Sequence, residues 1–283
     1  MKLVRYGNPG KEKPGLIDAE GKLRDLSAVV GDIGPEQLGD AALAKLRKLK
    51  VDRLPLVRGK PRFGCPVSQV GKFIAIGLNY ADHAAESGMP IPKEPVVFTK
   101  AVSCIQGPND PVMLPKNSVK GDWEVELGVV IGTRARYVSQ KNALDYVAGF
   151  CVFNDISARD IQSREHANKV ILLGKSFDTS CPLGPWLTTR DEIPDPEHLQ
   201  MQLRLNGELR QNANTSEMIY GIRELVAWWS QITLEPGDVI TSGSPAGVIA
   251  GRDDAVWLKP GDRIEATIER LGTLVSIIAA EKA

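Results

Sequence analysis

An acidic strand segment constrains the fold of this chain more than any other feature of its sequence. In Asp122-Trp-Glu-Val-Glu-Leu-Gly-Val-Val-Ile-Gly132, acidic and apolar residues alternate, and an apolar run follows. Side chains alternate between the two faces of a β-strand, so Asp122, Glu124 and Glu126 are expected on one face. Carboxylates gathered on one face of a buried strand repel one another and are costly to desolvate, and a divalent cation would relieve both costs. The alternative is an exposed edge strand with solvated acids, which the apolar run disfavours.

A further acidic position follows another predicted strand, at residues 146–154. Asp155 comes directly after this strand and can complete an all-oxygen site with Glu124 and Glu126, or it can cap the turn that follows. Carboxylate oxygens prefer hard cations, so Mg²⁺ or Mn²⁺ is expected, with Ca²⁺ as a further candidate. Zinc is less favoured, because the chain has only three histidines, at 83, 166 and 198, and no HxxxH pair.

Other polar positions suggest chemistry more weakly. His83 and Glu86 have helical spacing, so the pair can deprotonate a water, or His83 can be incidental on a surface helix. Arg159 and Gln162 are three residues apart, which suits recognition of a carboxylate. Lys175 can stabilise an oxyanion, with an exposed lysine as the default alternative.

A small-residue turn adds one more candidate. The segment 241–247 follows a predicted strand and contains Ser242, Gly243 and Ser244. Such residues let backbone N–H groups approach an anion, although a turn with no ligand is equally consistent with the pattern.

The chain is predicted to be α+β and dominated by sheets, because it has many strand patterns, few helices and no regular βα alternation. Residues 1–62 are expected to form a small α/β module, with a strand, a hairpin over 15–26 and a helix over 35–50. A segment rich in proline and glycine then leads to the main domain, residues 68–283, in which a second helix is expected over 215–229.

Composition excludes several classes of protein. The chain has 283 residues, with 35 basic and 35 acidic side chains and no net charge, which argues against a nucleic-acid or membrane-surface partner. No apolar segment has the length of a membrane span or a signal peptide, so a cytoplasmic protein is expected. The four cysteines, at 65, 104, 151 and 181, are widely spaced, and buried free thiols are favoured over disulfides.

Together these motifs resemble the fumarylacetoacetate hydrolase family over residues 70–275. The resemblance rests on Gly77-Leu-Asn-Tyr-Ala-Asp-His83, Pro95-Val-Val-Phe-Thr-Lys100, Asp122-Trp-Glu-Val-Glu126, Asn154-Asp-Ile-Ser-Ala-Arg-Asp160, Lys175-Ser-Phe-Asp178, Asn206-Gly-Glu-Leu-Arg-Gln211, and Pro236-Gly-Asp-Val-Ile240 followed by Ser242-Gly-Ser-Pro245. It implies a mixed β-roll, usually dimeric, with metal ligands at Glu124, Glu126 and Asp155. It also implies a water-activating pair at His83 and Glu86, a catalytic lysine at Lys175, and substrate contacts at Lys100, Arg159, Gln162 and Ser244. Many members have threonine where this chain has Ser242 and Ser244.

The implied activity is metal-dependent hydrolysis of a C–C bond in a 2,4-diketo acid of acylpyruvate type, which yields pyruvate and a small acid. The segment 175–185 and the N-terminal module are most similar to hydrolases of 2,4-diketo-3-deoxy sugar acids derived from L-rhamnonate or L-fuconate. Oxaloacetate decarboxylase, dienoate isomerase or decarboxylase, and ureidoglycolate lyase are the alternatives within the family. A non-catalytic binder of keto acids or metal is the alternative of another class, and the His83–Glu86 pair argues against it.

Overall fold

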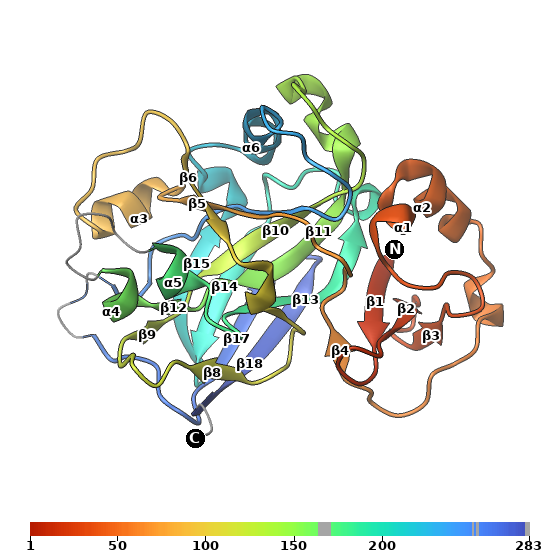
Figure 1. Cartoon of the computed structure of the whole chain (residues 1–283), viewed down its shortest axis with the longest axis horizontal. Helices are drawn as coiled ribbons and strands as arrows, with labels where there is room; N and C mark the ends of the chain where they lie inside the picture. The colour runs from red at the N-terminus through yellow and green to blue at the C-terminus, as the bar shows by residue number, and fades with distance from the viewer. Residues whose placement is uncertain (164–170, 251, 253–254, 281–283) are drawn as a thin grey trace.

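The apolar runs of the sequence form the central strands of one large sheet (Figure 1). Strands β10 (Val125–Ile131) and β11 (Val147–Asn154) are buried along their whole length and pair antiparallel. The sheet has the order β3-β2-β1-β13-β11-β10-β16-β5-β6. Its other strands are β1 (Lys2–Tyr6), β2 (Lys13–Ile17), β3 (Leu23–Asp25), β5 (Phe73–Gly77), β6 (Val96–Lys100), β13 (Cys181–Thr189) and β16 (Val239–Thr241), with the short β4 (Phe63–Gly64) beside β1 and β7 (Ile105–Gln106) beside β13. The computed structural model describes residues 1–163, 171–250, 252 and 255–280, so His166 lies outside the described residues.

A second sheet of five strands packs against the first and closes the main core. Its order is β15 (Glu208–Asn214), β14 (Gln200–Leu205), β17 (Arg263–Ile268), β18 (Gly272–Ala280) and β8 (Val112–Leu114). Leu127 of β10, Leu203 of β14 and Ala266 of β17 belong to one buried cluster. Exposed and buried residues alternate in β14, as expected for a sheet with one face toward solvent. A third, two-stranded sheet pairs β9 (Gly121–Asp122) with β12 (Ser157–Ala158). The predicted sheet-dominated α+β class is thus confirmed.

The N-terminal residues share both sheet and core with the rest of the chain. β1 pairs antiparallel with β13, and Leu3 and Leu38 lie in one buried cluster with Phe153 and Leu183. The division into modules at residues 62 and 68 stays a prediction. The helix predicted over 35–50 is wrong in its extent: α1 (Pro35–Leu38) and α2 (Asp40–Arg47) are separated because Gly39 has an extended backbone. A 3₁₀ turn, η1 (Val51–Arg53), follows.

The helices of the main part are short, and three of them gather at one end of the large sheet (Figure 1, left). These are α3 (Ala81–Glu86), α4 (Arg159–Gln162) and α5 (Ile171–Lys175). The helix predicted over 215–229 is also shorter than expected. Asn214 and Glu217 do form the expected capping box, but on a 3₁₀ turn, η5 (Thr215–Glu217), and α6 (Ile222–Trp229) starts only after an extended Gly221. The remaining 3₁₀ turns are η2 (Val102–Cys104), η3 (Gln140–Tyr146) and η4 (Arg190–Glu192).

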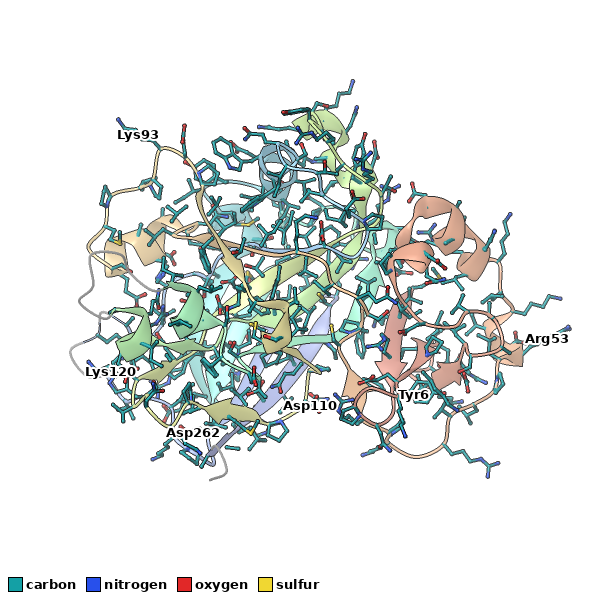
Figure 2. The ribbon with its side chains drawn as sticks, in the orientation of Figure 1. Tyr6, Arg53, Lys93, Asp110, Lys120 and Asp262 are labelled. Atoms are coloured by element: carbon teal, nitrogen blue, oxygen red, sulfur yellow. The ribbon has the colours of Figure 1, made fainter. Side chains whose placement is uncertain are left out.

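The two ends of the molecule differ in what they carry. In Figure 2, the labelled Tyr6 and Arg53 lie in the N-terminal part, whereas Lys93 and Lys120 lie toward the end that holds α3, α4 and α5.

None of the helices in the described part of the chain is long and apolar enough to cross a membrane. The cysteines carry free thiols, and Cys104, Cys151 and Cys181 are buried as expected, while Cys65 is half-buried.

Candidate active site

Three acidic side chains meet where β10 begins and β11 ends. Val125 pairs with Asn154, and this register places Glu124, Glu126 and Asp155 beside one another. The backbone is fixed there, because Asp155 N donates to Glu124 O at 2.8 Å and Glu124 N donates to Asn154 Oδ1 at 3.1 Å. One carboxylate oxygen from each acid lies within 4.8 Å of the others, and all three side chains are buried. Buried carboxylates at this spacing form a group that can hold a hard divalent cation.

Two lysines balance the charge of this group. Lys175 Nζ lies 2.6 Å from Glu124 Oε2 and 3.0 Å from Asp155 Oδ2, and it also donates to Ser157 Oγ at 2.9 Å. Lys100 Nζ donates to Asp155 Oδ1 and to the backbone oxygen of Lys175. The Lys100 ammonium is completely buried behind Asp155, so the structure places it against a proposed metal ligand and not on the cavity wall.

The surroundings drive the pKa values of the two glutamates apart. Burial raises the pKa of Glu126 to about 8, and the negative charges of Asp155 and Glu124 add to this effect. Burial also disfavours ionisation of Glu124, but the positive charges of Lys175 and Arg159 prevail and hold its pKa well below the usual range. Of the two glutamates, Glu126 is therefore the one that needs a cation to become ionised at neutral pH.

Arg159 joins the acid group to a neighbouring loop. Its Nη2 lies 2.5 Å from Glu124 Oε1, its Nε 2.8 Å from Asp122 Oδ2, and its Nη1 donates to Gln162 Oε1 at 3.0 Å. Asp122 also accepts hydrogen bonds from the backbone N–H groups of Ile249 and Ala250. Asp122 is therefore not a member of the acid group, and it orients Arg159 instead.

A cavity of about 340 Å³ opens over the acid group. Its polar wall consists of His83, Ser87, Glu124, Glu126, Arg159, Gln162, Ser163, Lys175 and Ser244. The apolar part of its lining, called the apolar wall below, consists of Ile76, Gly77, Leu78, Met89, Val96, Phe98, Ile171 and Ala250. Leu78 has a left-handed backbone with a φ of 51°, which is uncommon for leucine and is typical of a residue held in place at a functional site.

His83 and Glu86 stand at the rim of this cavity on α3. His83 Nδ1 lies 3.4 Å from Glu86 Oε2, and the Glu86 carboxylate also accepts from the backbone N–H of Gly247 at 3.1 Å. Ser244 Oγ accepts from Gln211 Nε2 at 2.8 Å, and Gln211 Oε1 in turn accepts from Val125 N at 2.9 Å. The dyad is thus tied to the segment 244–247, which also supplies Ser244.

Seven of the ten predicted site residues line the cavity, Glu86 and Asp155 contact His83 and Lys175 of that lining, and Lys100 is buried behind Asp155. Sequence reasoning missed the apolar wall and the role of Gln211 in holding Ser244. A signal for the wall was available at Val96 and Phe98, which are apolar residues of an edge strand that begins after a proline-rich segment. Gln211 ends one of the motifs that carry the family resemblance, but no local pattern indicates its role, because its partners are distant in the sequence.

Comparison with known proteins places this site in a known class of enzymes. Residues 72–279 match the family model described as fumarylacetoacetate (FAA) hydrolase C-terminal. A protein of Burkholderia multivorans, provisionally named a hydrolase, is 54% identical over 284 residues and covers 100% of both chains. The structure of a fumarylacetoacetate hydrolase from Exiguobacterium antarcticum has a TM-score of 0.85 and 34% identity, covering 99% of this chain and 100% of that one.

A further solved structure bears on the acid group. The maleylpyruvate hydrolase of Sphingobium sp. SYK-6, in complex with manganese(II) ion and pyruvate, has a TM-score of 0.82 and 28% identity, with 100% of each chain covered. The fold and the site thus define a metal-site enzyme of the hydrolase and isomerase type. The chain belongs to the fumarylacetoacetate hydrolase family.

Proposed function

We propose that this protein hydrolyses the C3–C4 bond of a 2,4-dioxo acid of acylpyruvate type, releasing pyruvate and a small carboxylic acid. The observation that carries the proposal is that one cavity unites a buried carboxylate group, two cationic side chains and a His–Glu pair. A non-catalytic binder would not need the His83–Glu86 pair.

The carboxylate group suits a divalent cation, and Glu124, Glu126 and Asp155 would hold it. When bound, such a cation supplies Lewis-acid polarisation to the oxygens of a 2-oxo acid. The presence of manganese(II) and pyruvate in the maleylpyruvate hydrolase structure supports this assignment. Mg²⁺ and Mn²⁺ are the proposed cations, and Ca²⁺ is a further candidate because all the donors are oxygens.

The chain's own residues bind the substrate and move the protons. Arg159 and the amide of Gln162 bind the substrate carboxylate, since both line the polar wall and Gln162 is oriented by Arg159. His83, held by Glu86, removes a proton from a water, which attacks the C4 carbonyl. The positive charge of Lys175 stabilises the oxyanion that forms at C4. The C3–C4 bond then breaks, and C3 of the leaving pyruvate enolate takes up the proton that His83 removed from the water.

The apolar wall suggests which acyl group is accepted. Leu78, Val96 and Phe98 line the cavity, and the Phe98 ring lies 5.9 Å from Lys175 Nζ, so a C4 substituent packed on these residues would contact mainly carbon atoms. We propose a short acyl group with at most one hydroxyl. The lactoyl group of the sugar-acid derivatives meets this condition, and so do plain alkanoyl groups.

A coupled assay tests the proposal. Purified protein with Mn²⁺ or Mg²⁺ is given a panel of acylpyruvates, oxaloacetate, a dienoate and ureidoglycolate, and pyruvate, CO₂, diene absorbance and urea are followed separately. We expect pyruvate and an equimolar acid from the acylpyruvates, with loss of activity in EDTA. Metal-dependent turnover of only another substrate would replace hydrolysis with that reaction, and no turnover of any would remove the proposal.

We also propose that the protein is a homodimer. In support, β6 is an edge strand of the large sheet and carries Val96 and Val97, which are 37% and 43% exposed. Light scattering on the purified protein tests the oligomeric state.

A further inference from the structure

Two cysteines lie in contact beneath the acid group, in a part of the molecule that the proposed reaction does not use. Cys104 Sγ and Cys181 Sγ are 3.1 Å apart, although the residues are separated by 77 positions in the sequence. The parallel pairing of β7 with the start of β13, in which Cys181 is opposite Ile105, brings them together. A disulfide requires a sulfur–sulfur distance of about 2.05 Å, so the two sulfurs need to approach by only about 1 Å.

The surroundings make the two sulfurs chemically unequal. The hydrogen bond between the two sulfurs lowers the pKa of Cys104 more than burial raises it, and the positive charge of Lys100 lowers it further. Burial raises the pKa of the Cys181 thiol well above its usual value. Cys104 is therefore the better nucleophile of the pair, and Cys181 is placed to act second.

Access to Cys104 requires only a local opening. Cys104 is the last residue of the three-residue turn η2, which lies at the surface and includes Val102, 44% exposed. Short turns of this kind open with much smaller free energies than the core strands, and hydrogen peroxide is little larger than water.

We propose that Cys104 and Cys181 form a peroxide-responsive dithiol that closes reversibly to a disulfide. The Cys104 thiolate attacks one oxygen of hydrogen peroxide, the O–O bond breaks, and a sulfenic acid and hydroxide are formed. The sulfur of Cys181 then attacks the Cys104 sulfur as its thiol proton is lost, and the departing hydroxide and that proton form water. In total, two thiols and one peroxide give one disulfide and two waters.

The cysteine pair is linked to the acid group through contacts with the backbone carbonyl of Lys175. The backbone oxygen of Lys175 accepts hydrogen bonds from Lys100 Nζ and, at 3.2 Å, from Ser180 Oγ, and Cys181 Sγ lies 3.9 Å from it. The side chain of Lys175 reaches Glu124 and Asp155. The loop that the disulfide closes also contains all three proposed metal ligands. Movement of the Cys181 sulfur thus alters the packing on which the acid group rests.

Thiol titration of the full-length protein tests the reaction without any assumption about its substrate. After treatment with hydrogen peroxide and denaturation, we expect two of the four thiols to be lost, peptide mapping to show a 104–181 linkage, and dithiothreitol to restore all four. Retention of four thiols, or a linkage between other cysteines, would overturn the proposal. Because the wild-type protein is measured, this result does not depend on the folding of a variant.

Variants of the same chain provide matched controls. Cys65→Ser and Cys151→Ser should still lose two thiols, whereas Cys104→Ser should lose none. Cys181→Ser should lose only the Cys104 thiol, as a sulfenic acid that dithiothreitol reduces, and should form no disulfide. The coupling is tested by calorimetric titration with Mn²⁺ alone, for which we expect at least a threefold difference in affinity between the oxidised and reduced wild-type protein. Equal affinities would refute the coupling to the acid group.

Discussion

Glu86 is in contact with His83: its Oε2 lies 3.4 Å from His83 Nδ1, while the same carboxylate accepts from the N–H of Gly247. A carboxylate held in this way fixes the orientation of the imidazole. The arrangement is the one that a general base for a bound water requires. The chain contains a second pair with the same spacing, His198 and Asp195, which is solvent-exposed.

These two pairs allow a controlled test of the base. His83→Ala should lower kcat by about 10²–10⁴-fold, because proton removal from the water is lost. Its Mn²⁺ affinity should change little, since His83 is not in the acid group. His198→Ala should keep wild-type kcat and affinity. Steady-state kinetics and calorimetric Mn²⁺ titration provide the readouts, and unchanged turnover in His83→Ala would rule out the assignment.

The binding of Mn²⁺ should strengthen as the pH rises from about 5 to 8. Glu126 keeps its proton in the folded protein up to a pKa of about 8, whereas its ordinary value is 4.5. Between these values the unfolded chain binds fewer protons than the folded one, so the metal-free protein loses stability as the pH rises. Mn²⁺ competes with that proton, so the increase in Tm that it causes should grow across the same interval.

Thermal melts in EDTA and in Mn²⁺ at several pH values measure this effect. In Glu126→Gln the pH-dependent part of the Mn²⁺ shift should vanish together with most of the binding. The control Glu208→Gln, at an exposed carboxylate, should behave as wild type. An Mn²⁺ shift of equal size at pH 5.5 and pH 8 would contradict the role given to Glu126.

Loss of Lys100 should destabilise the fold as well as the site. Lys100→Met leaves the buried Asp155 without one of its two ammonium partners, and removal of one member of a buried pair costs about 3–5 kcal/mol. Lys72→Met is the matched control, because Lys72 is partly exposed and Asp238 retains two backbone N–H donors. Its cost should be about 1 kcal/mol or less.

Urea unfolding in EDTA measures both free energies. Added Mn²⁺ should recover part of the loss in Lys100→Met, because the cation replaces the missing positive charge beside Asp155. A Lys100→Met protein as stable as wild type would show that Asp155 needs no such partner.

The apolar wall should set the preference for the acyl group. Each buried CH₂ contributes about 0.8 kcal/mol, so kcat/KM should rise roughly three- to fourfold per added CH₂ in straight-chain acylpyruvates until the cavity is full. Phe98→Ala should flatten this rise, and Val29→Ser, at an exposed position in the N-terminal part, should not. The opposite order, with polyhydroxylated acyl groups preferred, would show that the wall does not contact the substituent.

Much of the fold could be predicted from the sequence, because buried strands carry a strong local pattern. The runs that became β10 and β11 were apparent from their apolar residues. The helix ends were less predictable, because Gly39 and Gly221 interrupt patterns whose apolar spacing alone continues past them.

The site residues also differ in how far the sequence could predict them. The acids could be identified because charges in an apolar strand are conspicuous and because their motifs resemble those of a family. The buried position of Lys100 behind Asp155 could not, because it depends on how β6 and α5 pack, and residues 100, 155 and 175 are far apart in the sequence. Contacts of this kind are set by tertiary structure, which no local periodicity encodes.

The position of β1 beside β13 has a consequence for the order in which the strands can pair during synthesis. The amino group of Met1 donates to Thr189 Oγ1, across 188 positions of sequence. While the chain leaves the ribosome, β1 can pair early with β2, but its partner on the other side, β13, exists only after about two-thirds of the polypeptide has been synthesised. The hairpin of β1 and β2 therefore joins the large sheet only late in synthesis.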